Sequence, residues 1–313
     1  MGKICIVLAT YNGEKYLQEM LNSLASQTRP ADKIIVIDDG SSDTTPEILR
    51  QNQGKLPLQL VLCAQNQGHR AAFSKGLEEA QKILNEDDFI ALADQDDIWL
   101  PEKLEILEKN IGKESLVFGD AEIIDQNGKL TKPSWRAFAK IESDCTMKHQ
   151  IAGINNVTGC LSLFRANLLP KILPIPENVT VHDRWVAMLV LKNGGIKAIP
   201  QVVAQYRIHG NNAVGGAKPA SMSKTLDTQQ KWIEQIIECK QVLQLDKSEL
   251  GFATKLLELT KRRKQKDFAI SYLPWIFANR NFLFLKSNIF KTLCRVAFTA
   301  VGLPFAQKHL GKE

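Results

Sequence analysis

Residues 89–97 have the sequence FIALADQDD, in which five apolar residues lead directly into a loop with three carboxylates. The apolar run predicts a buried β-strand over residues 89–93. Carboxylates crowded this closely raise one another's pKa and cost stability unless a cation neutralises them. Mg²⁺ and Mn²⁺, which prefer oxygen ligands, suit such an acidic cluster. A solvated turn that caps a helix over residues 101–110 is the alternative explanation.

Apolar runs followed by polar residues occur three more times on the N-terminal side of this stretch. The predicted strands cover residues 3–9, 33–37 and 58–62, and the polar clusters after them are TYNG at 10–13, DDGSSD at 38–43 and NQGHR at 66–70. Segments with helical spacing alternate with the strands, at residues 14–26, 44–52, 71–84 and 101–110, and a further strand is predicted at 116–118. This alternation predicts an α/β fold with a mostly parallel sheet flanked by helices. Ligands of such sheets bind beyond the carboxyl ends of the strands, so the four clusters predict a binding site.

The composition is that of a globular protein. The chain has 313 residues, of which 44% are hydrophobic and 24% charged, so collagen-like and disordered classes are excluded. Six cysteines are scattered singly, which argues against a zinc knuckle, a thioredoxin-type site and a disulfide framework. No charge-free stretch of about 18 apolar residues occurs, so a membrane-spanning helix is not expected. Reduced thiols and the lack of an apolar leader predict a cytoplasmic protein.

Two common phosphate-binding motifs are absent from the sequence. The first predicted strand is not followed by GxGxxG, and GxxxxGK followed by Ser or Thr does not occur. A classical dinucleotide fold and a P-loop enzyme are therefore disfavoured. Phosphate must then be held by a metal ion and by side chains, with Arg70 as a candidate. In the pair Asp38–Asp39, one carboxylate can accept from a ribose hydroxyl or a base N–H while the other holds the turn.

The ordered set of motifs resembles the family 2 glycosyltransferases, which have the GT-A fold. The motifs are TYNGEKYL at 10–17, IIVIDDGSSD at 34–43, NQG at 66–68 and ALADQDDIWLP at 91–101, and the resemblance covers about residues 3–213. The DQDD-x-W form at 94–99 and YRIHGNN at 206–212 look like bacterial rhamnosyltransferases that build surface polysaccharides such as O-antigen.

The resemblance implies an inverting, metal-dependent transfer of a sugar from a nucleotide diphosphate to an acceptor hydroxyl. L-rhamnose from dTDP-rhamnose is the expected donor, and a saccharide that is lipid-linked is the expected acceptor. A UDP-hexose- or UDP-HexNAc-dependent transferase of the same fold is one alternative, and a non-catalytic nucleotide-sugar-binding protein is the other. Phosphoryl transfer is disfavoured because no activating lysine or P-loop accompanies Asp39 or Asp94.

The resemblance also implies which residues bind the donor. These residues are Thr10, Tyr11, Asn12, Glu14, Asp39 and Asp94. We add Arg70, the candidate phosphate contact, and Gln95 of the acidic loop to the expected nucleotide-sugar-binding residues. Asp94 and Asp96 correspond to the DxD pair, with Asp94 nearer the ribose and Asp96 on a Mn²⁺ or Mg²⁺ ion. His209 of the YRIHGNN motif is expected to add a metal or diphosphate contact, unless it is an ordinary loop histidine.

Asp183 is the expected general base. Inversion needs a base on the face of the sugar opposite the leaving group, and HDRW at 182–185 opens a helical pattern where relatives carry an acidic residue before a helix. Many relatives have Glu-Asp there, whereas this chain has His182-Asp183, which leaves the role of His182 open. Asp183 as a helix N-cap is the alternative, and it is compatible with catalysis. Cys160 is interpreted as small core filler and not as a nucleophile.

The last third of the chain differs from the rest in charge. We expect a GT-A domain at 1–220 and a helical C-terminal extension at 221–313, where 16 Lys or Arg stand against 8 Asp or Glu. Between residues 268 and 305, nine aromatics are interleaved with four cations and no acid. Such a composition is typical of a lipid headgroup interface, whereas nucleic-acid binding is disfavoured because no recognised module accompanies the charge.

This composition predicts that residues 268–313 associate peripherally with an anionic membrane, on the inner face of the bacterial plasma membrane. Packing of the aromatics on the catalytic domain or against a second subunit is the alternative, since an ordinary amphipathic helical cap has the same pattern.

Overall fold

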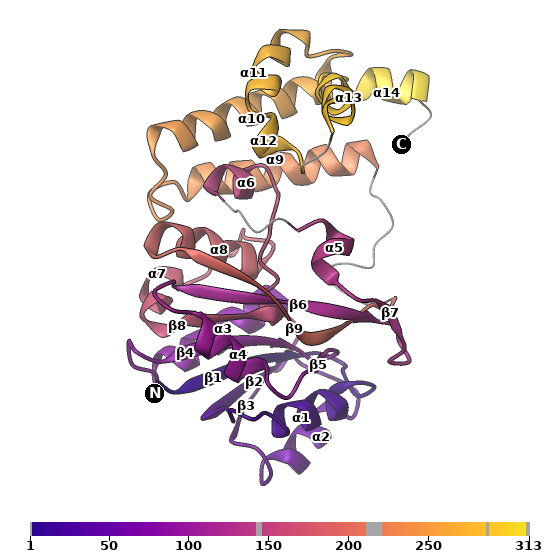
Figure 1. Cartoon of the computed structure of the whole chain (residues 1–313). Helices are drawn as coiled ribbons and strands as arrows, with labels where there is room; N and C mark the ends of the chain where they lie inside the picture. Colours follow the sequence, from indigo (N-terminus) through magenta and orange to yellow (C-terminus); the bar gives the residue numbers. More distant parts are fainter. Residues whose placement is uncertain (1, 142–145, 211–220, 286–287, 311–313) are drawn as a thin grey trace. The chain divides into compact units, whose positions relative to one another are not determined.

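The computed structural model describes residues 2–141, 146–210, 221–285 and 288–310 (Figure 1). Within these ranges the chain forms two compact units. The first comprises residues 1–143 and 157–216, and the second comprises residues 144–156 and 217–313. The boundary expected at residue 220 lies outside the described residues.

The first unit is built on one mixed sheet, whose strand order in the described residues is β3-β2-β1-β4-β8-β6-β9-β5, with β7 paired to β6. The first four strands are parallel to one another, so the α/β architecture expected from the alternating pattern is confirmed. Their bounds and those of the helices between them are β1 (Ile4–Thr10), α1 (Leu17–Ala25), β2 (Lys33–Asp38), α2 (Thr45–Asn52), β3 (Leu58–Leu62), α3 (His69–Gln81) and β4 (Phe89–Asp94).

The central strands are nearly continuous apolar runs because helices cover both of their faces. Ile4, Ile6 and Leu8 pack into a core cluster that includes residues of α1 and α4 (Lys103–Asn110). Val7 faces the opposite side and contacts α3, where a Cβ added to Gly76 would lie 2.3 Å from Val7 Cγ1. The glycine therefore lets this helix approach the sheet closely.

Of the strands that follow β4, the sequence pattern predicted only part of one. The predicted strand at 116–118 extends to β6 (Leu116–Ile124), because Gly119 and Asp120 continue the strand against β9 (Ile196–Arg207). β9 contains Pro200 at a place where the pairing register shifts, which is where a strand tolerates proline. The remaining strands are β5 (Ile98–Trp99), β7 (Leu130–Lys132) and β8 (Ser162–Arg165), which runs antiparallel between β4 and β6.

The helix starts expected at residues 14, 44, 71 and 101 all differ from the observed ones by one to three residues. The helix expected from residue 14 begins at Leu17, because the carbonyl of Gly13 accepts the N–H groups of both Tyr16 and Leu17 in a turn. The helix expected from residue 71 begins at His69, directly after Gly68. The other helical elements of this unit are α5 (Trp135–Ala139), η1 (Gly159–Leu161), η2 (Ala166–Leu168), α7 (Leu169–Ile172) and α8 (His182–Asn193).

The second unit is helical, as expected for the C-terminal extension. Its two long helices are joined by the ion pair Lys264–Asp227, at 2.6 Å, and the indole of Trp232 donates to the carbonyl of Gln150 at 2.9 Å. None of the helices in the described ranges is long and apolar enough to cross a membrane. The helices are α6 (Met147–Ile151), α9 (Met222–Glu238), α10 (Lys247–Gln265), η3 (Ile270–Tyr272), α11 (Leu273–Ala278), α12 (Arg280–Leu283), α13 (Ile289–Thr299) and α14 (Leu303–Leu310).

Candidate functional site

The parallel strands bring the polar clusters to one edge of the sheet. Thr10 at the end of β1 is in register with Asp38 at the end of β2, and Ala9 is in register with Asp94 at the end of β4. The Thr10 hydroxyl donates to Oδ1 of Asp38 at 2.9 Å. The clusters after these three strands therefore meet where ligands of parallel sheets bind.

The loops after β1 and β2 hold each other through side chains. Oδ1 of Asn12 accepts the N–H of Ser42 at 2.9 Å, and Oε2 of Glu14 accepts from the Thr44 hydroxyl at 2.8 Å. Two of the expected donor-binding side chains are thus engaged with the neighbouring loop. The side chains of Asn12 and Glu14 therefore fix the loops after β1 and β2 relative to each other.

The pair Asp38–Asp39 divides two tasks. Asp38 accepts from the Ser41 hydroxyl at 2.6 Å and so holds the turn after β2. Asp39, which is buried, accepts the N–H groups of Gln67 at 3.0 Å and Gly68 at 2.7 Å and so ties the loop after β3 to this edge. A carboxylate has about four lone-pair sites, so Asp39 keeps acceptor capacity for a ligand.

Gln95 fixes the backbone of Tyr11. Its Oε1 accepts the Tyr11 N–H at 2.8 Å and its Nε2 donates to the Tyr11 carbonyl at 3.0 Å. The amide can come this close because residue 13 is glycine: a Cβ there would lie 2.2 Å from Oε1 of Gln95. The Tyr11 side chain itself is 45% exposed and is presented at the surface of the site.

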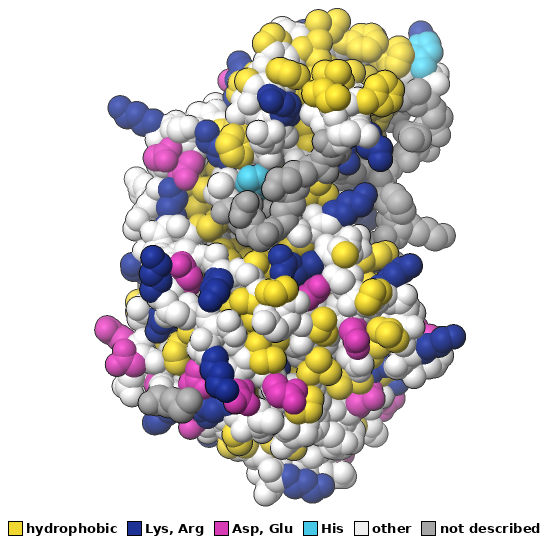
Figure 2. Space-filling model, viewed as in Figure 1, with side chains coloured by type: hydrophobic (Ala, Val, Ile, Leu, Met, Phe, Trp, Pro, Cys, Tyr) yellow, Lys and Arg dark blue, Asp and Glu magenta, His cyan; other side chains and the backbone are white. Residues whose placement is uncertain are grey.

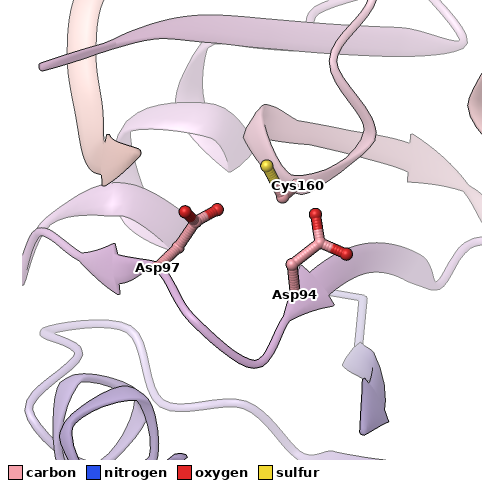
Figure 3. A group of neighbouring side chains, drawn as sticks. All are labelled: Asp94, Asp97 and Cys160. Carbon is pink, nitrogen blue, oxygen red and sulfur yellow. The ribbon is translucent and has the colours of Figure 1, made fainter. Parts of the chain in front are cut away.

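Three groups that could ligate a metal lie together in the first unit: the carboxylates of Asp94 and Asp97 and the thiol of Cys160 (Figure 3). One ligand atom of each lies within 4.8 Å of the others. The carboxylates flank the turn between β4 and β5, and the thiol faces them from η1.

Burial and neighbouring charges raise the pKa values of the acids in this cluster. Burial, together with the carboxylates of Asp96 and Asp183, raises the pKa of Asp94 to about 7. Burial and the carboxylates of Asp97 and Asp94 raise the pKa of the Cys160 thiol well above its ordinary value. Cys160 is therefore a neutral thiol in the core, which agrees with its interpretation as filler and makes it a poor metal ligand.

A buried lysine supplies the cation of this cluster. Lys103 of α4 is fully buried, its ammonium donates to the Cys160 carbonyl, and its Nζ lies 3.4 Å from the centroid of the Trp99 ring. Burial lowers the pKa of Lys103 to about 7, and the carboxylates of Asp97 and Asp94 oppose that shift. An internal ammonium and a protonated thiol make these three groups a poor fit for a hard divalent cation.

Asp96 has a different partner. Oδ2 of Asp96 lies 2.8 Å from Nε2 of His209, in the loop after β9. Both side chains keep some solvent access, 16% for Asp96 and 13% for His209. A partly exposed carboxylate and imidazole suit Mn²⁺ or Mg²⁺, whose remaining ligands are substrate phosphate and water. The two residues expected to hold a metal thus lie together, and their chemistry fits the ion.

Arg207 joins the end of β9 to the acidic loop. The side chain is only 2% exposed. Its backbone N–H donates to Oδ1 of Asp97 at 3.0 Å, and its Nε donates to the carbonyl of Asp96 at 2.8 Å. A third contact runs from the guanidinium to Oε2 of Glu19 in α1, at 2.5 Å. Arg207 therefore sets the position of the loop that carries Asp96.

Asp183 lies in the first turn of α8, beside the acidic loop. The N-cap position is Val181, so the interpretation of Asp183 as the N-cap is wrong. Oδ2 of Asp183 accepts the N–H of Gly159 at 3.4 Å. Its charge contributes to the raised pKa of Asp94, which places the two carboxylates near each other.

His182 is a neutral core residue. It is 8% exposed, and its ring stacks on Phe73 of α3 with 3.8 Å between the centroids. Burial, with a contribution from His69, lowers the pKa of His182 to about 3. Its Nδ1 has no hydrogen-bond partner among the described residues. The role left open by the sequence is therefore packing behind Asp183.

Arg70 follows the loop that binds Asp39, since Gly68, two residues before it, donates to that carboxylate. It occupies the first turn of α3, and its guanidinium donates to the carbonyl of Ile175, in the segment before α8, at 3.3 Å. Within the described residues, no hydrogen bond or ion pair joins Arg70 to the acidic loop.

Sequence reasoning missed Lys103 and Arg207. Lys103 lies in a helix whose other charges keep at least partial solvent access, so its full burial has no counterpart in the local pattern. Arg207 belongs to the YRIHGNN motif, in which only His209 received a role. An arginine two residues before a candidate metal ligand was the available clue.

The sequence matches one protein-family model and is similar to several known proteins. A family model described as "Glycosyl transferase family 2" matches residues 5–173. The UDP-Glc:alpha-D-GlcNAc-diphosphoundecaprenol beta-1,3-glucosyltransferase WfgD of Escherichia coli is 29% identical over 218 residues, which are 66% of this chain and 77% of that protein.

Solved structures share the fold at lower identity. The structure of S. aureus TarS 1–349 in complex with UDP-GlcNAc has a TM-score of 0.57 at 20% identity and covers 90% of this chain and 80% of that one. The mannosyltransferase PcManGT from Pyrobaculum calidifontis, in complex with GDP-Man and Mn²⁺, has a TM-score of 0.53 at 17% identity and covers 95% of this chain and 84% of that one.

Proposed function

The chain belongs to glycosyl transferase family 2 and has the α/β GT-A fold, and we propose that it transfers a sugar from a nucleotide diphosphate to an acceptor hydroxyl with inversion. One observation carries the proposal: the 2.8 Å contact between Asp96 and His209, which are 113 residues apart. Both lie at the sheet edge where the polar clusters meet. A catalytic role is favoured over a binding scaffold because Asp183, at the expected base position, contributes to the raised pKa of Asp94 in the acidic loop.

We assign donor binding to the loops after β1, β2 and β4. Asp39 has acceptor capacity left for a base N–H or a ribose hydroxyl, and Asp94 lies at the same edge at the end of β4, with β1 between the two strands. The exposed ring of Tyr11, held by Gln95, is available to contact the nucleotide. Thr10, Asn12 and Glu14 keep the loops in shape. Arg70 stays a proposed diphosphate contact, because a guanidinium has five N–H donors and the Ile175 carbonyl uses one.

Asp96 and His209 are the residues that would hold Mn²⁺ or Mg²⁺. When bound, the ion supplies positive charge for the departing diphosphate. Arg207 keeps Asp96 at the surface of the site, and Lys103 balances the buried carboxylates behind it. Lys103 thus neutralises the pair Asp94 and Asp97, whereas a divalent ion from solution would neutralise Asp96.

Asp183 is the proposed general base. Its carboxylate takes the proton of the acceptor hydroxyl while the acceptor oxygen attacks the anomeric carbon. The bond from that carbon to the diphosphate oxygen breaks, and the nucleotide diphosphate leaves with the electron pair. The N–H of Gly159 holds the carboxylate in place, at 3.4 Å from Oδ2.

The proposed donor is dTDP-L-rhamnose, which rests on the resemblance of DQDD-x-W and YRIHGNN to rhamnosyltransferases. A UDP-hexose or UDP-HexNAc donor is the second candidate. It is favoured by the named relatives, since WfgD is described by UDP-Glc and TarS was solved with UDP-GlcNAc.

The proposed acceptor is a lipid-linked saccharide in bacterial polysaccharide synthesis. WfgD, which is named for a diphosphoundecaprenol acceptor, supports this choice. We also propose a cytoplasmic location at the inner face of the plasma membrane, with peripheral attachment through residues 268–313. The described cysteines, including buried Cys5 and exposed Cys294, are all free thiols, as in a reducing compartment.

Asp183→Asn tests the catalytic proposal. The change keeps the size and the Gly159 contact but removes the base, so we expect turnover of the donor to fall by at least about a hundredfold. Donor affinity, measured by calorimetry, stays within about twofold, because the residue contacts the acceptor and not the nucleotide. Asp87→Asn, the same change at an exposed carboxylate in the turn before β4, is the matched control.

Two results would count against the assignment. Undiminished turnover in Asp183→Asn removes Asp183 from the mechanism. Donor binding without any turnover in the unaltered protein, over a panel of acceptors, favours the binding-protein alternative.

A further inference from the structure

The most exposed face of α13 is apolar. Phe290, Leu293 and Phe298 are 72%, 48% and 48% exposed, although an ordinary surface helix turns such residues inward. With about 100° per residue, positions 290, 293, 294, 297 and 298 fall on one side of the helix. All five are exposed, and the buried side is formed around Val296.

The apolar face is continuous with its surroundings in the second unit. A shallow pocket of about 500 Å³, lined by Phe284, Cys294, Arg295, Phe298 and Thr299, opens beside it. Figure 2 shows hydrophobic side chains gathered over α11 and α13. Exposed apolar areas of this kind mark a contact with a protein or a membrane.

The charged residues around α13 distinguish a membrane from a protein as the partner of this face. Viewed along the helix axis, the exposed Lys291 lies next to Phe298, and Arg295 lies next to Lys291 on the side away from Phe298. Cations therefore border the apolar face. The charged residues from 268 to 310 are Arg280, Lys286, Lys291, Arg295 and Lys308, without a single acid. A segment whose charges are all cationic is complementary to anionic lipid headgroups and repels the same segment of a second copy.

We propose that α13 lies in the surface of an anionic bilayer, with the side chains of Phe290, Leu293 and Phe298 in the acyl region and Lys291 and Arg295 at the phosphates. A helix of 11 residues with one apolar face is suited to this position and not to spanning. The inference deepens the proposed function, since it names the face that brings the enzyme to a lipid-linked acceptor.

Vesicle flotation tests this proposal with the full chain. Vesicles of phosphatidylcholine with about 30% phosphatidylglycerol are compared with neutral ones. We expect the protein to float with the anionic vesicles, and Phe290→Ser with Leu293→Ser to lower the partition coefficient at least about tenfold. Lys291→Gln with Arg295→Gln should weaken binding to anionic vesicles by about tenfold and make it less sensitive to salt.

A matched control uses two equally exposed apolar residues of the first unit. Leu130 and Phe138 are 51% and 52% exposed, and Leu130→Ser with Phe138→Ser should float as the unaltered protein does. Because all four changes are at exposed positions, circular dichroism and thermal unfolding should match throughout. Donor calorimetry on the same variants separates the two proposals, since a protein that floats but binds no nucleotide sugar loses the proposed function only.

Three outcomes would overturn the inference. The first is a failure of the unaltered chain to float with anionic vesicles. The second is equal loss of flotation in the control variant. The third is a dimer, seen by light scattering of the unaltered protein, that the Phe290→Ser and Leu293→Ser changes dissociate, because the face would then belong to a second copy.

Discussion

The buried imidazole of His182 makes folding stability depend on pH. Its pKa is lowered from 6.5 to about 3, because burial disfavours the charged form. A base with a lowered pKa in the folded state contributes stability that is present above about pH 6.5 and is lost as the pH falls towards 3. The unfolded chain takes up the proton first, which favours unfolding in acid.

His182→Phe removes this titration and keeps an aromatic ring against Phe73. Between about pH 7 and pH 5, the free energy of unfolding of the unaltered protein should fall by about 2 kcal/mol more than that of the variant. Urea unfolding at both pH values measures the difference, and any constant cost of the larger ring cancels. Equal pH dependence in the two proteins would show that folding does not lower the pKa of His182.

Single residues were predictable from the sequence where a motif carries them. Asp96 and His209 received their roles from motif positions, and the structure brings them into contact. Lys103 and Arg207 did not, because their importance arises from burial. Lys103 is enclosed beside the acidic loop that precedes it, and Arg207 contacts Asp97 from 110 residues away. A local pattern shows that a charge exists but not that the fold encloses it.

At the scale of elements, α3 depends on Gly76 for its approach to the sheet. A Cβ at this position would lie 2.3 Å from Val7 Cγ1 and 3.2 Å from Ile37 Cγ1. Gly76→Ala should therefore lower the free energy of unfolding by about 1–3 kcal/mol through overpacking, despite the better helix propensity of alanine.

Gly251 in α10 is the matched control, because nothing lies within 4 Å of an added Cβ there. Gly251→Ala should raise the free energy of unfolding by about 0.5–1 kcal/mol. Chemical denaturation of both variants is the measurement, and the two changes must have opposite signs. A stabilised Gly76→Ala protein would mean that α3 can move away from β1 without cost.

The elements themselves were predictable where the chain alternates locally. β1 to β4 are apolar runs between helices, and each follows from a few neighbouring residues. β8 and β9 enter the sheet from far along the chain, and β9 contains Pro200 at a register shift. Their pairing with β6 is a tertiary event that sequence periodicity does not record.

At the scale of the whole molecule, the two units have separate proposed tasks. The polar sheet edge of the first unit binds and transfers the sugar, and the apolar and cationic surface of the second unit contacts lipid. The charge follows the same division, since the extension from residue 221 carries 16 cations and 8 acids. Variants of one surface are therefore expected to leave the other function unchanged.

We propose that a nucleotide sugar and a divalent cation bind together at the edge of the sheet that carries Asp96 and His209. Isothermal calorimetry with dTDP-rhamnose, UDP-glucose, UDP-galactose, UDP-N-acetylglucosamine and GDP-mannose, each with and without Mn²⁺, tests it directly. Asp96→Asn is compared with the exposed control Asp87→Asn. We expect that one donor binds and that Mn²⁺ raises its affinity at least about tenfold. Asp96→Asn should abolish this increase in affinity, and Asp87→Asn should not. Binding of no donor by the folded protein, or an equal gain from Mn²⁺ in Asp96→Asn, would contradict this proposal.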